Sequence, residues 1–311
     1  MVSLRMRSAP VALLILFCAA AASAAPLERE MAITFDDLPA VPATMSIARQ
    51  RQLTRDLLRS IRTAGVPAIG FVNEDKLATP AHAGLLRSWL AEGLELGNHT
   101  YSHPDLHSTD IGRYEEEILR GESVTRALLA QSGRAPRWFR HPYLHTGTSL
   151  ETRRRIEAFL GDHGYRVAPV TLDNSEWIFA RAYELAGDRA MRKRIGKAYL
   201  EYLDRKVAYY EDQSQKLFGR NIRHVLLLHA NALNAAWFDD LAAMLTTRGY
   251  RFITLERALE DPAYRSPDTY AGKAGISWIH RWAITAGKKS PFFDGEPATP
   301  EWIQDYARIR E

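Results

Sequence analysis

Short apolar runs alternate with segments of helical periodicity along most of this chain, and this alternation strongly constrains its fold. Apolar runs of this length, bounded by polar residues, are typical of buried strands. Strands that alternate with helices indicate β/α units and a parallel sheet. We expect strands near residues 31–35, 66–72, 94–97, 138–139, 165–170, 225–228 and 252–255, and helices near 46–64, 79–92, 110–132 and 149–163.

Residues suited to metal chemistry follow two of these runs. Asp36 and Asp37 end the first run, and two adjacent carboxylates are costly to bury unless a cation holds one of them. His99 and His103 follow another run, and Pro104 disfavours a helix there, so we expect both to lie on one turn. Two imidazoles and one carboxylate leave coordination positions open for water and substrate, as a catalytic zinc site requires.

The two aspartates suit different roles. Asp37 can bind the cation while Asp36 takes a proton from water, whose pKa falls to about 7 on zinc. Each motif alone is equally compatible with a solvated turn or with ordinary histidines. Two histidines and one carboxylate also make the facial triad of iron oxygenases, so this enzyme class remains an alternative.

Three later segments complete a pattern in chain order: Arg140-His141-Pro142-Tyr143, residues 173–177 and residues 226–229. Together with the first two motifs, they resemble the five sequence blocks of the polysaccharide deacetylases, carbohydrate esterase family 4, over about residues 30–255. The resemblance implies a distorted parallel β/α barrel of about seven strands. It also implies a divalent metal, with Zn²⁺ expected and Co²⁺, Ni²⁺ or Mn²⁺ as alternatives, and removal of acetyl groups from sugars.

The resemblance implies roles for the residues of the first three blocks. Asp36 corresponds to the general base, and Arg140 to the residue that orients it. The implied metal ligands are Asp37, His99 and His103.

The remaining blocks imply groups that bind the acetyl group and donate a proton. The backbone N–H of Tyr143 would face the oxyanion, Trp177 and Leu228 would line the acetyl pocket, and His229 would act as general acid. General chemistry agrees, because a tetrahedral intermediate needs donors at its oxygen and a leaving amine needs a proton from a group that titrates near neutrality.

Two positions depart from the family pattern. Leu144 stands where the third block often has glycine, which puts the conformation of that loop in question. Glu176 replaces the aspartate that normally tethers the catalytic histidine. Either Glu176, whose side chain is one methylene longer, or Asp173 would hold His229.

Length and composition indicate an exported single-domain enzyme. Residues 1–24 resemble a secretory signal, with Arg5 and Arg7 before an apolar run at 11–17 that is too short to span a membrane. Cys18, the only cysteine, lies in that segment. We expect one catalytic domain at 25–311, in the periplasm or secreted. Without the two signal arginines the chain has 39 basic and 37 acidic residues, which gives no argument for nucleic acid binding.

Two segments add to the core at 30–255. Residues 188–218 have helical periodicity and end at Gly219, and we expect an amphipathic helix there. Its tyrosines offer an alternative role as a wall of the substrate groove, since they resemble sugar-stacking residues: Tyr199, Tyr202, Tyr209 and Tyr210. The tail at 257–311 is expected to wrap around the barrel and bury its aromatic residues.

Three function classes remain. The leading one is metal-dependent deacetylation of an N-acetylated, or O-acetylated, envelope or extracellular glycan such as peptidoglycan, a chitin-like polymer or poly-N-acetylglucosamine. The others are an iron oxygenase and a non-catalytic glycan-binding protein. Asp36 and His229 argue against the iron oxygenase. The presence of the whole set argues against the non-catalytic protein: Asp36, Asp37, His99, His103 and His229. The other histidines are expected to be structural, although His107 and His145 are candidates to line the groove. Oligomeric state stays open.

Overall fold

We describe a computed structural model in which residues 2 and 29–311 are defined, so the expected signal segment lies almost entirely outside the described part. Its strands are β1 (Arg29–Val41), β2 (Ile69–Val72), β3 (Glu95–Asn98), β4 (Trp138–Phe139), β5 (Arg166–Val167), β6 (His224–Asn231) and β7 (Tyr250–Phe252). The helices are α1 (Ile47–Thr63), α2 (Pro80–Ala91), α3 (Ile111–Arg120), α4 (Ser123–Ala130), α5 (Leu150–Asp162), α6 (Glu176–Leu185), α7 (Arg189–Phe218), α8 (Ala232–Thr247), α9 (Leu255–Leu259), α10 (Trp278–Thr285) and α11 (Glu301–Ala307). Short 3₁₀ turns span Glu74–Lys76, Pro142–Leu144 and Pro262–Arg265.

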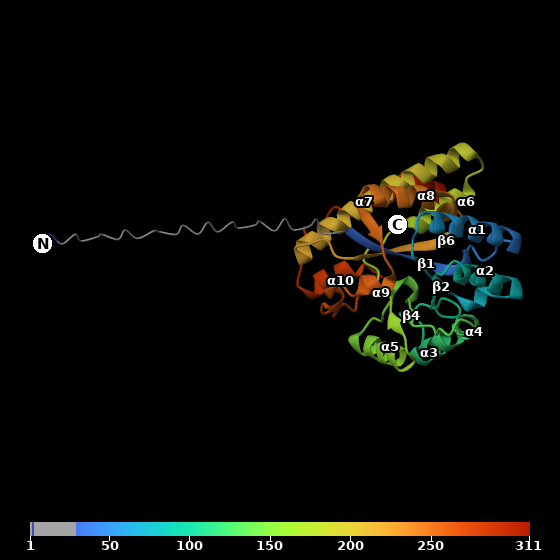
Figure 1. Ribbon diagram of the computed structural model, residues 1–311, viewed down its shortest axis with the longest axis horizontal. Helices are drawn as coiled ribbons and strands as arrows, with labels where there is room; N and C mark the ends of the chain where they lie inside the picture. The colour runs from blue at the N-terminus through green and yellow to red at the C-terminus, as the bar shows by residue number, and fades with distance from the viewer. Residues whose placement is uncertain (1, 3–28) are drawn as a thin grey trace.

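The strands form one parallel sheet in the order β5-β4-β3-β2-β1-β6, and β7 pairs with the beginning of β1. The sheet curls until one segment joins its two edges. Residues 166–167 pair with β4, and Leu172, five residues later, forms a bridge to Leu226 in β6. Helices surround the sheet (Figure 1). The expected distorted parallel β/α barrel is therefore confirmed.

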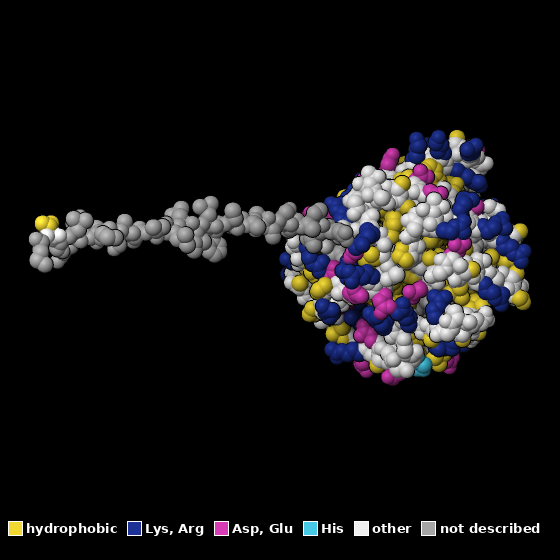
Figure 2. Space-filling view, in the orientation of Figure 1, with side chains coloured by type: hydrophobic (Ala, Val, Ile, Leu, Met, Phe, Trp, Pro, Cys, Tyr) yellow, Lys and Arg dark blue, Asp and Glu magenta, His cyan; other side chains and the backbone are white. Residues whose placement is uncertain are grey.

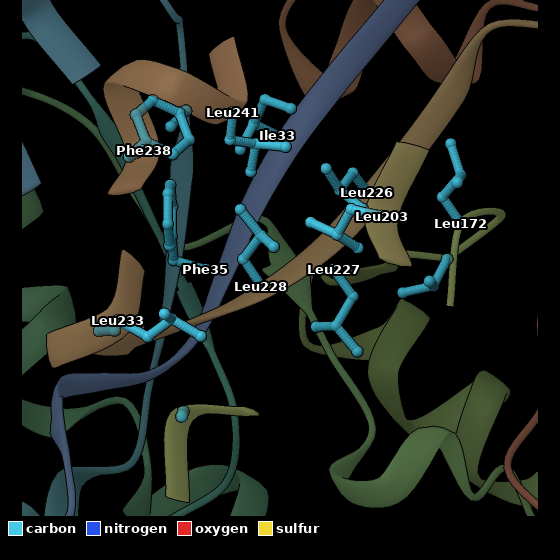
Figure 3. Packing of buried hydrophobic residues seen from close by; sticks show 14 of the residues in the cluster. Ile33, Phe35, Leu172, Leu203, Leu226, Leu227, Leu228, Leu233, Phe238 and Leu241 are labelled. Carbon is cyan, nitrogen blue, oxygen red and sulfur yellow. The ribbon is translucent and has the colours of Figure 1, made fainter. Parts of the chain in front are cut away.

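The two faces of the sheet have different neighbours because successive side chains of a strand point to opposite sides. Ile33 and Phe35 of β1 face outward and pack with Leu228, Phe238 and Leu241 (Figure 3). The inward face belongs to a smaller cluster inside the barrel, whose members include Ala32, Phe71, Trp138 and Val225. Side chains on the inward face of a strand therefore point into the barrel, also at the carboxyl ends of the strands.

Two of the expected elements are built differently in the structure. The apolar residues at 252–255 were expected to form one strand, but β7 ends at Phe252 and α9 begins at Leu255, capped by Thr254. The helix expected at 110–132 is two helices, and Asp110 caps the first. The first helix ends at Gly121, where a Cβ atom would lie 2.4 Å from the Thr100 carbonyl carbon.

The two added segments cover one side of the barrel. The insertion is a single helix, α7, which ends at Gly219 in a left-handed conformation (φ 70°), as its periodicity predicts. In the C-terminal extension Trp278, Trp282 and Phe292 are buried, which agrees with a wrapping tail.

Lys and Arg side chains are interspersed with Asp and Glu on the face seen in Figure 2. No helix within the described residues has the length and apolar character needed to cross a membrane.

A pair of leucines in β6 tests the assignment of the two faces. Leu228→Ala should lower the free energy of unfolding by about 2–5 kcal/mol, because a fully buried leucine is removed from a packed cluster. Leu227→Ala should cost less, since Leu227 points away from Leu228 (Figure 3) and lines a cleft. Urea unfolding measures both; equal losses would contradict the assignment.

Candidate active site

A cleft of about 1150 Å³ opens at the carboxyl ends of the strands. Motif residues from β1, from the loops after β3 and β4, and from β6 line it. They include Asp36, Asp37, His99, His103, Tyr143, Asp173, Trp177 and His229. The structure therefore brings most of the residues identified in the sequence to one place, where parallel barrels carry their active sites.

The register of β1 with β6 places the two candidate proton-transfer groups side by side. Asp36 and His229 are direct partners in this parallel pairing. In β1, Thr34 and Asp36 lie on the same inward face as Ala32. In β6, Leu227 and His229 lie on the same inward face as Val225. Strand alternation alone thus directs one carboxylate and one imidazole into the same interior.

Asp37 should point to the other face of a regular strand. It does not, because its φ of 67° breaks the regular alternation within β1, and the register with both neighbouring strands shifts around this position. Thr100 and His103 also have left-handed φ values, of 70° and 59°. Such conformations cost free energy in non-glycine residues and concentrate at functional sites. Here they turn ligand side chains toward the cleft.

Asp37, His99 and His103 form a group whose candidate ligand atoms all lie within 4.8 Å of one another. His103 Nε2 lies 3.8 Å from Asp37 Oδ1. His99 Nδ1 lies 2.8 Å from the carbonyl oxygen of Arg140 and donates to it, because a carbonyl can only accept, so Nε2 is left unprotonated toward the cleft. A hydrogen bond from the ring nitrogen that does not bind the metal orients a metal-binding histidine. The donor set fits a divalent cation.

The two adjacent carboxylates have opposite electrostatic environments. Burial raises the pKa of Asp36 to about 6, although Arg140 opposes this. Burial also acts to raise the pKa of Asp37, but Lys76, His103 and other positive groups outweigh it and hold that pKa well below its ordinary value. Lys76 Nζ lies 3.0 Å from Asp37 Oδ1. Asp37 therefore stays ionised, while Asp36 can gain and lose a proton near neutral pH.

Arg140 is fully buried beneath Asp36. Its Nη1 lies 3.5 Å from Asp36 Oδ2, and its Nη2 donates to Thr34 Oγ1 at 3.1 Å. Asp36 Oδ1 is buried and has no protein hydrogen-bond partner. An unpaired buried acceptor is costly, so a water or substrate donor at this oxygen would be favourable.

Glu176 contacts the histidine on the other side of the cleft. His229 Nδ1 lies 2.8 Å from Glu176 Oε2, while Asn231 and Asn234 donate to the other carboxylate oxygen. Burial disfavours the charged ring, yet the hydrogen bond to Glu176 and its charge raise the pKa of His229 to about 9. No hydrogen bond joins Asp173 to His229 among the described residues. Of the two candidate tethers, the geometry favours Glu176.

The loop after β4 carries Tyr143 in a left-handed conformation, with φ 56°, and Leu144 follows with φ 57°. The C-terminal extension presses on this loop: a Cβ atom at Gly275 would lie 1.7 Å from the Tyr143 carbonyl oxygen. Leu144, in the position where glycine was expected, is buried. Tyr143 and Leu144 thus have a backbone conformation that glycine would adopt without strain. The segment around Gly275 packs against the loop that has this conformation.

One acetyl-pocket assignment from the sequence needs correction. Leu228 is fully buried in the outer core and does not line the cleft, whereas Leu227 does. The reason is strand alternation, because Leu227 and not Leu228 shares the face of His229. Trp177, the other expected member, lines the cleft with 45% of its surface exposed.

A second group of metal-binding residue types lies nearby: Asp105, His107 and His145. Its groups already satisfy one another, since His145 Nδ1 lies 2.7 Å from Asp105 Oδ1 and Gly147 N–H donates to His107 Nε2. The two imidazoles stack in parallel planes with centroids 3.8 Å apart. One ion cannot lie in the plane of both rings, so this group fits a structural role. His145 lines the cleft, as the sequence allowed.

Several residues of the cleft had no signal in the sequence. Lys76 lies in a short 3₁₀ turn, and Lys206, His280 and Glu296 come from α7 and the C-terminal extension. Isolated charged residues in surface-like segments carry no pattern, and only the fold brings them to the site. Of the four tyrosines proposed as groove residues, Tyr210 lines the cleft, whereas Tyr199 and Tyr202 are fully buried.

Metal binding can be tested apart from any activity. His103→Ala should weaken Zn²⁺ binding by more than roughly 100-fold, because loss of a ligand should exceed the roughly 10–100-fold effect of losing a residue that only hydrogen-bonds to a ligand. Metal content after dialysis and titration calorimetry measure this. His107→Ala is the matched control and should bind normally. Full binding in the first variant, or equal loss in the control, would contradict the assignment.

Comparisons with known proteins agree with these observations. The polysaccharide deacetylase family model matches residues 24–168, which contain the candidate metal ligands, Asp36, Arg140 and Tyr143. A peptidoglycan-N-acetylglucosamine deacetylase of Bacillus cereus is 26% identical over 151 residues, which are 48% of this chain and 46% of the relative. The chain spans about half the length of the first curated relatives that it matches.

Two solved structures share the fold. A chitin deacetylase from Colletotrichum lindemuthianum has a TM-score of 0.52 and 20% identity, with 79% of this chain and 94% of that chain covered. A pseudoenzyme of carbohydrate esterase family 4 from Bacillus anthracis has a TM-score of 0.51 and 13% identity, with 76% and 66% covered. The family model over residues 24–168 and the curated relatives show that this chain is similar to the polysaccharide deacetylases, and the solved structures show that it shares their fold.

Proposed function

We propose that this protein is a metal-dependent hydrolase that removes acetyl groups from an N-acetylated glycan. One observation carries the proposal: an Asp36–Arg140 pair and a His229–Glu176 pair face the Asp37, His99 and His103 group from two sides of one cleft. A hydrolase of amides needs a base, an acid and a site for an electrophile, and this cleft contains candidates for all three.

Asp37, His99 and His103 would hold the cation, and Zn²⁺ suits two imidazoles and one carboxylate. When bound, a divalent cation supplies a Lewis acid that polarises a carbonyl and lowers the pKa of water. Asp36, with a pKa of about 6, takes the proton of the attacking water, and Arg140 holds its carboxylate in place. The Tyr143 backbone N–H stabilises the negative charge that develops on the acetyl oxygen.

His229 completes the reaction. With a pKa of about 9 it is protonated at neutral pH, and its Nδ1 is engaged with Glu176, so Nε2 can give a proton to the leaving amine. Trp177 and Leu227 would enclose the acetyl methyl group. Export to the periplasm or the medium remains part of the proposal, since glycans of the cell envelope are found there.

Two alternatives keep specific support. The fold is shared with a pseudoenzyme, so a non-catalytic role on this fold has a structural precedent. The ligand group is also compatible with an iron enzyme. An iron oxygenase has no need of the paired base and acid. Acetate release from a panel of acetylated glycans by the zinc-loaded protein supports the proposal; glycan binding without acetate release would favour the first alternative.

Substitution of Asp36, the candidate general base, tests its role separately from metal binding. Asp36→Asn should retain the metal, because Asp36 lies outside the ligand group, and should lower kcat about 10²- to 10⁴-fold, the usual contribution of general-base catalysis. Metal content and kcat are measured on the same preparation. Loss of metal in this variant would mean that the roles of the two aspartates are exchanged.

The pH profile tests the acid candidate. Activity should rise as pH passes about 6, where Asp36 loses its proton, and fall as pH passes about 9, where His229 loses its own. Glu176→Gln should move the alkaline limb to lower pH. A glutamine can donate to the neutral imidazole and removes the negative charge that favours the protonated ring, so the pKa should fall toward the ordinary value of about 6.5.

The matched variant is Asp173→Asn, which removes a second nearby carboxylate that makes no hydrogen bond to His229. It should leave the alkaline limb in place, and metal content should be unchanged in both variants. An alkaline limb that moves in Asp173→Asn and stays in Glu176→Gln would identify the other carboxylate as the tether.

A further inference from the structure

The cleft extends beyond the proposed reaction centre to a group of charged residues that the mechanism does not use. Lys206 and Tyr210 come from α7, Glu296 and His280 come from the C-terminal extension, and Asp173 follows the strand segment that closes the barrel. The four contributed by α7 and the extension lie outside residues 24–168, where the family model matches. Most of this end of the cleft is therefore built by the insertion α7 and the C-terminal extension.

The group is organised around one ion pair. Lys206 Nζ lies 2.6 Å from Glu296 Oε1, and the Tyr210 hydroxyl donates to the same oxygen at 3.0 Å. Lys206 is 4% exposed, whereas the Glu296 side chain is 35% exposed at the cleft. The Lys206 ammonium lines the cleft, and its ion pair with Glu296 holds it in one position. It is therefore a preorganised hydrogen-bond donor for a ligand in the cleft.

Hydrogen-bonding capacity remains on both sides of this pair. Lys206 has three N–H donors, and Glu296 is its one hydrogen-bond partner within the described residues. Among those residues, Glu296 Oε2 and Asp173 Oδ2 also accept no hydrogen bond; Asp173 Oδ1 accepts one from the following backbone N–H. The cleft wall thus presents unpaired donors next to unpaired acceptors.

The charges select the class of ligand. Two carboxylates beside one ammonium disfavour an anion, and the ammonium disfavours a metal ion. A neutral molecule with neighbouring hydroxyl groups, each of which donates and accepts, matches alternating donors and acceptors. At about 1150 Å³ the cleft is larger than the roughly 300–1000 Å³ of typical small-ligand pockets, so it has room beyond one acetylated sugar.

We infer that Lys206, Glu296 and Asp173 form a saccharide subsite, which binds the hydroxyl groups of a sugar ring adjacent to the ring that loses its acetyl group. This inference rests on the proposed function, because it assumes that the substrate is a glycan. It assigns the insertion and the extension a role in recognising an oligomer rather than a single sugar.

The test compares a tetramer of N-acetylglucosamine with the monomer, using the whole protein. The double variant Lys206→Met with Glu296→Gln removes both charges together, so no buried charge is left unpaired. Titration calorimetry of the metal-free protein should show tetramer binding weakened roughly tenfold or more, because hydrogen bonds to charged groups are lost. With zinc, KM for the tetramer should rise more than KM for the monomer.

The matched control is Lys216→Met with Asp212→Asn, an exposed ion pair on the same helix that does not line the cleft. It should bind the tetramer as the unaltered protein does. Glu296→Gln alone keeps the ammonium paired through the amide oxygen, and it serves if the double variant does not fold. Thermal unfolding identifies that case.

The outcomes separate the two proposals. Unchanged tetramer affinity in both the double variant and Glu296→Gln would overturn the subsite, whatever the activity. Weakened tetramer binding, in a protein that releases no acetate from any glycan, would support the subsite and contradict the deacetylase proposal. Equal losses for tetramer and monomer would place these residues at the reacting sugar and overturn the adjacent subsite.

Discussion

The candidate site depends on strand β1, which pairs with β2, β6 and β7 and carries the two aspartates where its register shifts. Its pairing with β6 aligns Asp36 with His229, and its inward register buries Asp36 above Arg140. The strand is held on both edges by hydrogen bonds and on its outer face by a packed core. A base candidate that must keep one position therefore lies on a rigid element, as preorganised sites require.

The neighbouring aspartates show how one short sequence yields two chemical characters. Asp36 is buried, and burial outweighs the influence of Arg140, so its pKa rises. Asp37 is turned by its left-handed backbone toward Lys76 and His103, and their charges outweigh burial. Environments that drive the pKa values of two carboxylates apart are a recurring basis for assigning a base and a ligand. Here a single backbone dihedral separates the two environments.

The insertion and the extension have a common function in the architecture. Helix α7 and the segment after α9 pack against each other through the Lys206–Glu296 pair and through buried aromatic residues. The same extension contacts the Tyr143 loop at Gly275, so the segment that shapes one end of the cleft also supports the proposed oxyanion position. The proposed saccharide subsite and the proposed oxyanion position are thereby linked through one part of the chain.

The sequence by itself determined the order of β/α units, the α7 helix and the convergence of the ordered motifs, because periodicity and position at strand ends are local properties. It did not determine which β6 leucine faces the cleft, because a run of three leucines conceals the alternation until the pairing with β1 sets the face. Nor did it locate the break at Gly121 or the roles of Lys76, Lys206, Glu296 and Gly275. These depend on close approach between segments far apart in the chain, which only the tertiary structure decides.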